Sequence, residues 1–295
     1  MNFIKKHQGP ILLLIGALIW GTTFVAQSLG SDKVGPFTFN AIRFTISGVI
    51  LLIVGILIKD PKPTNKKYYI YAVLTGIALF LAATFQQVGI DMTKSAAKSG
   101  FLTSLYIVFV PIIGLLFKNK TNKLIWLWII IALFGSYLIA SKESFTFELG
   151  DILTIICSFF FALQILLIDK SVKYISSIKI CSVQFLVTGL LSFLLCFILE
   201  DVIMNNVMQA LPAILYAAIL SGCIAYLLQI IGQKTTEPTI ASLIMSLEAV
   251  FALLAGILIL KEQFNIKEIL GCILVFTAVI CSQINFKRGK LWKNI

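Results

Sequence analysis

The chain has 295 residues, of which 59% are hydrophobic and only 13% are charged, and its mean hydropathy is +0.99. A soluble domain carries about twice this charged fraction, so the composition excludes an ordinary water-soluble protein and favours a polytopic membrane protein. The net charge of +11 does not indicate nucleic acid binding, because the basic residues lie in short loops and the C-terminal tail rather than on one folded face.

Ten apolar segments are long enough to cross a membrane, since a spanning helix needs about 20 mostly apolar residues. In chain order, the predicted spans cover 11–29, 37–58, 68–90, 96–117, 124–141, 150–168, 179–199, 210–232, 239–260 and 267–286. Four prolines lie at or just before predicted helix starts, where a missing N–H costs little: Pro10, Pro36, Pro212 and Pro238. Pro111 lies inside the fourth span instead, and we expect it to kink that helix.

The basic residues of the short loops predict how the spans are oriented. With the N-terminus in the cytoplasm, seventeen lysines and arginines face the cytoplasm and six face the opposite side. Because positive charge is retained on the cytoplasmic side, we expect a multi-pass plasma-membrane protein with cytoplasmic tails at 1–10 and 287–295. The segment 11–29 is expected to remain as the first helix, because it is long enough to span and lacks the cleavage site of a signal sequence.

The chain repeats part of its own sequence. SLYIVFVPIIGLL at 104–116 aligns with SLEAVFALLAGIL at 246–258, and AIRFTISGVI at 41–50 aligns more weakly with SVQFLVTGLL at 182–191. Between these blocks, small and polar residues also recur at matched positions: Ala82, Gln86 and Gly89 align with Ala225, Gln229 and Gly232. Matches at polar and glycine positions indicate a true repeat rather than a shared apolar composition.

The spacing of the repeat gives five spans in each copy. Because five is odd, the second copy must cross the membrane upside down relative to the first. Inverted repeats that meet near the membrane midplane are typical of secondary transporters, whose halves exchange conformations to give alternating access. The predicted fold is therefore all-α, a membrane bundle of ten transmembrane helices in two inverted five-helix repeats that cover 11–141 and 150–286.

Three stretches carry a resemblance to a known family: ALIWGTTFV in the first span, NAIRF in the second, and ASLIMSLEAVFALLAGILILKEQFNIKEILGCILVFTAVI at the end. They resemble the EamA-type ten-helix transporters of the drug/metabolite transporter superfamily, over about residues 11–286. The resemblance implies export or exchange of small metabolites, such as amino acids or amphiphilic drugs, without ATP hydrolysis. The chain departs from the family pattern at Ala249, where proline usually follows the acid, and at Lys261, where glycine usually precedes Glu262. Proline therefore does not predict a kink in the ninth span.

Glu248 is the sharpest candidate for function, because it is an acid near the middle of the ninth span. A charged side chain at the membrane centre costs about 3 kcal/mol on insertion scales, so Glu248 should face the bundle interior. It is either a proton site or polar contact for a substrate, or a structural acid that joins helix ends. Tyr106 occupies the equivalent position in the first repeat, so the acid occurs once per molecule.

Polar and aromatic residues within the spans predict a substrate pathway. Glutamine amides would be unpaired in lipid and should point inward, although each one could instead join two helices. Aromatic rings with a few polar groups suit amphiphilic ligands. The predicted pathway residues are Trp20, Thr23, Gln27, Gln86, Tyr106, Phe161, Gln164, Tyr226 and Gln229, and Gln87 belongs to the same glutamine set. Arg43, inside the second span, either extends to the interface or pairs with an acid or a substrate carboxylate.

Several function classes lack their sequence signatures. The chain has no GxxxxGK[ST] phosphate loop, no HExxH motif, no paired carboxylates in a span and no TVGYG filter, so an ATP motor, an intramembrane hydrolase and an ion channel are not indicated. The six cysteines lie in apolar runs, and His7 is the only histidine, so we expect no metal, no cofactor and no enzyme activity.

The predicted function is a secondary transporter that exports small metabolites by alternating access. One alternative is a facilitator or exchanger without ion coupling, and another is a membrane scaffold or receptor without a transport cycle. The expected partners are a small-molecule substrate and the lipid bilayer, with no nucleic acid. An internally repeated chain of this kind can act as a monomer or as a homodimer.

Overall fold

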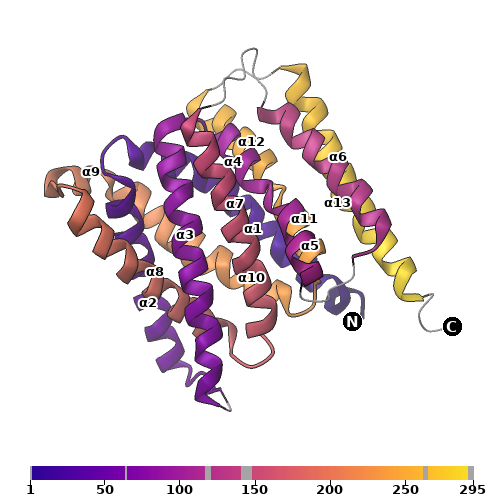
Figure 1. Ribbon diagram of the computed structural model, residues 1–295, viewed down its shortest axis with the longest axis horizontal. Helices are drawn as coiled ribbons and strands as arrows, with labels where there is room; N and C mark the ends of the chain where they lie inside the picture. Colours follow the sequence, from indigo (N-terminus) through magenta and orange to yellow (C-terminus); the bar gives the residue numbers. More distant parts are fainter. Residues whose placement is uncertain (1, 64, 117–120, 141–147, 262–264, 292–295) are drawn as a thin grey trace.

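Every regular element in the described part of the chain is a helix (Figure 1). The computed structural model describes the chain except Met1, Thr64 and residues 117–120, 141–147, 262–264 and 292–295. Ten helical segments are long and apolar enough to cross a membrane, which confirms the predicted polytopic all-α fold. Glu262 lies outside the described residues, as do four of the lysines counted for the orientation of the spans: Lys118, Lys120, Lys142 and Lys293.

The ten spans follow one another with short connections, and four of them are composed of more than one element. The first five are α1 (Asn2–Ser31), α2 (Pro36–Leu57), η1 (Lys66–Tyr68) with α3 (Tyr69–Thr93), α4 (Ala96–Ser104) with α5 (Tyr106–Leu116), and α6 (Lys123–Ala140). The second five are α7 (Leu149–Ser171), α8 (Ser177–Leu199), α9 (Met204–Tyr216) with the π-helical η2 (Ala217–Ala225) and α10 (Tyr226–Gln233), α11 (Pro238–Met245) with α12 (Glu248–Leu260), and α13 (Ile266–Leu291).

Some helices extend beyond the predicted spans. Helix α1 begins at Asn2 and α9 at Met204, so Pro10 and Pro212 lie inside helices rather than at their starts. Helix α13 likewise continues to Leu291. Hydropathy detects only the part of a helix that lipid surrounds, whereas the backbone hydrogen bonds continue through polar residues at the interface.

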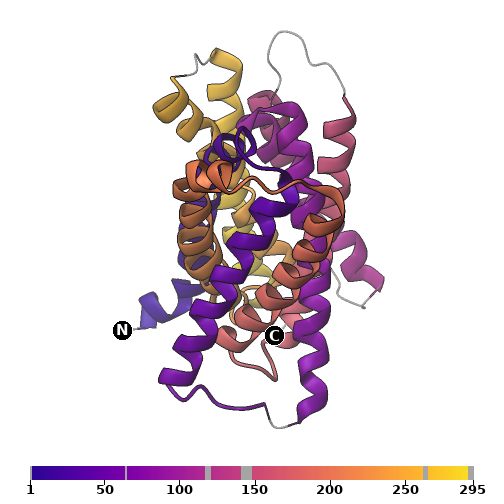
Figure 2. The ribbon, with the colours of Figure 1, turned by 90° about the vertical axis from the view of Figure 1, so that its left-hand side faces the viewer.

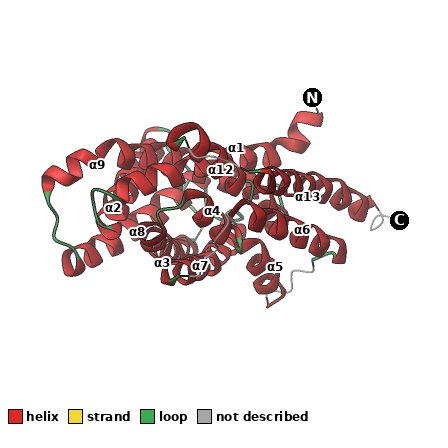
Figure 3. Cartoon of the chain, turned by 90° about the horizontal axis from the view of Figure 1, so that it is seen from above, coloured by secondary structure: helices red, strands yellow, loops and turns green. Residues whose placement is uncertain are grey.

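Different helices form the two ends of the bundle. Seen from above, α2, α8 and α9 lie at one end, and α6 and α13 lie at the other (Figure 3). Figure 2 views the molecule from the end formed by α2 and α8. The start of α1 and the end of α13 lie on the same side of the bundle (Figure 1), as an even number of spans requires.

Glycine contacts between α2 and α8 reveal the inverted symmetry. A Cβ atom on Gly48 would lie 2.9 Å from Leu186 Cγ, and a Cβ atom on Gly189 would lie 2.5 Å from Thr45 Oγ1. The higher-numbered residue of α2 contacts the lower-numbered residue of α8, and the reverse holds for the second contact. The two helices are therefore antiparallel. The repeat alignment makes Gly48 equivalent to Gly189, so the same contact is made twice, in opposite directions.

A second pair of contacts obeys the same symmetry. Helix α3 approaches α7 where Gly89 meets Gly150, and α10 approaches α1 where Gly232 meets Gly9. A Cβ atom on Gly89 would lie 2.8 Å from the Gly150 carbonyl oxygen, and one on Gly9 would lie 2.9 Å from that of Gly232. These crossings lie at opposite ends of the bundle, which confirms that the two five-helix repeats are inverted.

Acidic residues tie the ends of α2 and α8 together. Glu200, just after α8, accepts hydrogen bonds from the Phe37 N–H (2.8 Å), the Thr38 N–H (2.7 Å) and the Thr38 hydroxyl group (2.6 Å) at the start of α2. At the other end of the pair, Asp60 accepts from the Ser176 hydroxyl group and, at 3.1 Å, from Lys179 Nζ. Each acid satisfies donors or charge at the free N-terminus of its partner helix.

Replacing Glu200 by alanine is expected to lower the free energy of unfolding by about 2 kcal/mol, because two backbone N–H groups lose their acceptor. Thermal unfolding of the purified protein in detergent measures the change. Glu200→Gln keeps one acceptor oxygen in place and should lose less. Equal unfolding midpoints for the wild type and Glu200→Ala would contradict the capping role.

Candidate functional site

The fourth and ninth spans are interrupted near their middles, at equivalent positions. Helix α4 ends at Ser104 and α5 begins at Tyr106, while α11 ends at Met245 and α12 begins at Glu248. Tyr106 and Glu248 are therefore the first residues after the two interruptions. The backbone keeps right-handed helical dihedral angles at Leu105, Ser246 and Leu247, so the helical turns are tightened at these positions rather than separated into free helix ends.

A serine side chain bonds back to its own helix at each interruption. The Ser104 hydroxyl group donates to the Phe101 carbonyl oxygen (2.7 Å), and the Ser246 hydroxyl group donates to the Leu243 carbonyl oxygen (2.8 Å). Such bonds compete with the helical hydrogen bonds and bend helices. Pro111 lies inside α5, beyond the interruption, and the ninth span is interrupted although it has alanine in the family's proline position. Proline is therefore not the shared cause.

A central cavity lies between the repeats at the level of these interruptions. Its lining residues are Trp20, Phe24, Gln27, Arg43, Gln86, Thr103, Tyr106, Phe161, Gln164, Ile165, Ser221, Tyr226, Gln229, Met245 and Glu248. Its volume is about 40 Å³, which is room for a few water molecules. A metabolite can enter only if the surrounding helices or side chains move.

Much of the lining consists of repeat-equivalent positions. Gln86 faces the cavity with its equivalent Gln229, and Tyr106 does so with its equivalent Glu248. The cavity therefore lies across the pseudo-two-fold axis that relates the repeats. Because equivalent positions hold different residues, most clearly tyrosine opposite glutamate, the two sides of the cavity differ in chemistry.

Two residues that line the central cavity have a buried polar atom without a hydrogen-bond partner in the described part of the chain: Trp20 Nε1, a donor, and Gln229 Oε1, an acceptor. Tyr106 Oη and Glu248 Oε1 also lack a well-formed hydrogen bond, but the two groups interact with each other. An unpaired buried polar group costs about 1–3 kcal/mol. The arrangement is therefore suited to water molecules or to a solute that carries both donors and acceptors.

The glutamines form two chains, one on each side of the central cavity. Gln27 Nε2 donates to the side-chain oxygens of Gln86 (3.2 Å) and Gln87 (2.8 Å). On the other side, Gln229 Nε2 donates to Gln164 Oε1 (3.3 Å). Each of these bonds joins two helices, as one interpretation expected, and four of the five glutamines also line the cavity.

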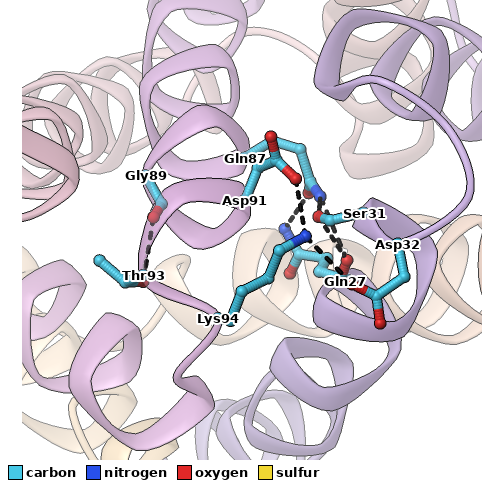
Figure 4. Close-up of polar contacts among 8 residues, drawn as sticks. All are labelled: Gln27, Ser31, Asp32, Gln87, Gly89, Asp91, Thr93 and Lys94. Carbon is cyan, nitrogen blue, oxygen red and sulfur yellow. Dashed lines mark hydrogen bonds and ion pairs between the residues drawn. The ribbon is translucent and has the colours of Figure 1, made fainter.

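Ion pairs lie at the end of α3, one turn beyond the first glutamine chain (Figure 4). Lys94 Nζ lies 3.1 Å from Asp32 Oδ1 and 2.8 Å from Asp91 Oδ1, which joins the end of α1 to α3. Burial by itself lowers the pKa of Lys94, but the hydrogen bonds to Asp91 and Asp32 outweigh it and raise the pKa above its usual value. Lys94 thus stays charged at neutral pH, and its ion pairs join the end of α1 to the end of α3.

Arg43 belongs to the central cavity, although the sequence left its orientation open. Its side chain is only 4% exposed, and Nε donates to Asn40 Oδ1 at 2.9 Å. The guanidinium carbon lies 4.4 Å from the centre of the Phe44 ring. Arg43 therefore does not extend to the membrane surface. Its spacing from Asn40 and Ser47 on one helical face is the signal that could have identified it.

Eight of the nine predicted pathway residues line the central cavity, together with Glu248. Thr23 does not line it, because its hydroxyl group donates to the Ile19 carbonyl oxygen of its own helix at 2.7 Å. The cavity is also lined by residues that were not predicted, since small or apolar residues give no sequence signal there: Phe24, Thr103, Ile165, Ser221 and Met245. In the described part of the chain, no three His, Cys, Asp or Glu side chains converge to hold a metal ion.

The sequence profile of the EamA-like transporter family matches the chain twice, at residues 7–141 and 148–283. An uncharacterized transporter of Archaeoglobus fulgidus is 31% identical over 94% of this chain and 86% of its own length. The uncharacterized transporter YoaV of Bacillus subtilis is 24% identical over 93% of this chain and 96% of its own length.

A solved crystal structure has a similar fold. It superposes with a TM-score of 0.81 at 16% sequence identity, over 96% of this chain and 99% of the other. At that identity the likeness concerns the arrangement of helices. It carries no information on what the central cavity binds.

Proposed function

Because the chain belongs to the EamA-like transporter family, we propose that it is a secondary transporter that exports small amino-acid-like or amphiphilic metabolites by alternating access. The observation that carries the proposal is a central cavity lined by equivalent residues of two inverted repeats. Inverted repeats can exchange their conformations, which opens such a site to one side of the membrane and then to the other.

The proposed orientation has both termini in the cytoplasm of a plasma membrane. It is supported by the excess of basic residues in loops on that side. The proposed repeat units, 11–141 and 150–286, are supported by the two matches to the family profile. In this orientation, the Lys94 ion pairs close the outer end of the pathway.

The mixed lining of the central cavity supports an amphiphilic solute. Trp20, Phe24 and Phe161 offer apolar contact, while Gln229 and Glu248 offer acceptors. Aromatic walls with a few polar groups are typical of sites for small amphiphiles. The small volume of the cavity supports a transport cycle in which the solute is admitted only when one end of the bundle opens.

Cysteine accessibility tests the proposed pathway. Gln86→Cys and Gln229→Cys, each made after the six native cysteines are replaced, should react with a membrane-impermeant thiol reagent from at least one side. Leu190→Cys is a matched control, because Leu190 lies on the outer surface of α8 and is expected to face lipid. If neither glutamine position reacts from either side, no aqueous pathway passes the cavity, and a scaffold or receptor would be the better interpretation.

Replacing Lys94 by alanine is expected to increase the fraction of molecules in which the outer end of the pathway is open. Each exposed ion pair contributes about 0–1 kcal/mol, so losing two of them shifts the equilibrium by up to about thirtyfold. The labelling rate of Gln86→Cys from the outside measures this shift. Lys33→Ala, on the same side and exposed, is the control that should leave the rate unchanged. A rate unaffected by Lys94→Ala would show that these ion pairs do not restrict access.

A further inference from the structure

We propose that the central cavity binds the carboxylate group of its solute through Arg43, so that the transported compounds are small organic monoanions or zwitterions. This inference rests on the proposed transport function and names the chemical class of the solute. The observation behind it is a buried guanidinium that faces the cavity and whose charge is not neutralised by a neighbouring acid.

Most of the hydrogen-bonding capacity of Arg43 is unused. A guanidinium has five N–H donors, and the structure gives it one hydrogen bond, from Nε to Asn40 Oδ1. No described residue accepts from its two terminal nitrogens. These nitrogens carry four N–H groups in a rigid fork that matches the two oxygens of a carboxylate.

The charge of Arg43 also has no counterion nearby. Among the described residues, no carboxylate oxygen lies within ion-pairing distance of it, and Glu248 is the one acid among those that line the cavity. Tyr226 also lines the cavity, and its phenol group interacts electrostatically with both Arg43 and Glu248. Buried charges within membranes are costly and are normally paired. A bound anion would supply the missing partner.

The surroundings of Arg43 hold its guanidinium in a defined orientation. Asn40, which accepts from Nε, is itself fixed because its Nδ2 donates to the Ala83 carbonyl oxygen at 2.9 Å. The Phe44 ring covers one face of the guanidinium, 4.4 Å from its carbon. A preorganised cation of this kind loses little freedom when it binds an anion.

Only the first repeat carries a cation at this position. The alignment places Gln184 at the position equivalent to Arg43, and its Oε1 accepts a hydrogen bond from Gln164 at 3.4 Å. One region of the cavity is therefore cationic, and Glu248 lies in another. A carboxylate at Arg43 would direct a donor group of the solute, such as an amine, toward Glu248. A single cation beside an acid suits a monoanion better than a doubly charged phosphate.

The experiment uses the full-length protein in liposomes loaded with a bacterial cytosolic metabolite extract, with the released compounds identified by mass spectrometry. Wild type, Arg43→Gln, Arg43→Lys and the exposed control Lys33→Gln are compared with protein-free liposomes. We expect compounds released by the wild type to carry a carboxylate. Arg43→Gln should lower their release about ten- to a hundredfold, Arg43→Lys should lower it less, and the control should match the wild type.

The outcomes separate this inference from the transport function. If the wild type releases only compounds without an anionic group, or if folded Arg43→Gln releases carboxylates at the wild-type rate, Arg43 does not select the solute and transport stands. If the wild type releases nothing beyond protein-free liposomes, the transport function itself is wrong. Should Arg43→Gln not fold, Asn40→Ala keeps the cation but frees its orientation. The Asn40→Ala variant must then release carboxylates more slowly than the wild type, and release at the wild-type rate would overturn the inference.

Discussion

Replacing Glu248 by glutamine is expected to lower solute exchange in proteoliposomes about ten- to a hundredfold, which is the loss of one hydrogen bond to a charged group. The remaining exchange should be independent of pH, because glutamine cannot exchange a proton. The variant should still fold, since the amide is isosteric with the carboxyl group. Exchange measured across the pH range in which both proteins stay folded tests all three expectations.

The reason for this expectation is the setting of the Glu248 carboxyl group. It is buried at the start of α12, and its Oε1 has no hydrogen-bond partner among the described residues. The titratable groups that face it are the phenols of Tyr106 and Tyr226 and the thiol of Cys157. The Tyr106 hydroxyl group interacts with it as a donor, and no described cation neutralises it. A proton or the donor group of a solute would therefore stabilise it further.

A structural acid would behave differently, and Glu268 is a matched control. Glu268 is also buried at the start of a helix, and its Oε1 is likewise without a hydrogen-bond partner among the described residues, but its Oε2 accepts a hydrogen bond from the Asn265 N–H at 2.7 Å. Glu268→Gln should lower thermal stability and leave the pH dependence of exchange intact. If Glu248→Gln lowers stability in the same way and keeps a pH-dependent exchange rate, Glu248 is structural, and an uncoupled facilitator or exchanger is favoured.

Replacing Gly271 by leucine is expected to prevent the folded protein from forming. A Cβ atom on Gly271 would lie 2.5 Å from the Gly135 carbonyl oxygen and 2.9 Å from a side-chain carbon of Ile139. The backbones of α6 and α13 touch at this point, so even alanine forces them apart, at a cost of about 1–3 kcal/mol. In lipid such close contacts are a main source of helix association.

The symmetry of this crossing sharpens the prediction. A Cβ atom on Gly135 would lie 2.7 Å from the Gly271 carbonyl oxygen, so Gly135→Ala should destabilise the protein about as much as Gly271→Ala. Gly55→Ala is the control, because its Cβ would lie 3.3 Å from the Ile178 Cγ2 methyl group and 3.9 Å from Asp60 Cβ, with no backbone atom in contact. Size-exclusion profiles and thermal unfolding in detergent measure the effect. Wild-type stability in Gly271→Ala would refute the contact.

Several residues show how far the sequence could predict the site. Gln86 and Gln229 were predicted to be inward-facing equivalents and both line the central cavity, as do Tyr106 and Glu248. Polarity within an apolar span predicts this, because lipid cannot hydrogen-bond an amide or a carboxyl group. The Thr23 hydroxyl group finds its hydrogen-bond acceptor within its own helix. A polar side chain of this kind therefore does not have to face the cavity.

The ten spans and the inverted repeat follow from local sequence. An apolar segment of this length must form a membrane-spanning helix, because lipid offers no hydrogen-bond partners to its backbone groups. Because each copy has an odd number of spans, the second copy must start on the opposite side of the membrane and is therefore inverted. Other features depend on residues far apart in the chain. The Ala83 carbonyl oxygen fixes Asn40, and Asn40 in turn aims Arg43 into the cavity. A side chain's orientation is set by the free energy of contacts that exist only after helices pack, and no local pattern contains those contacts.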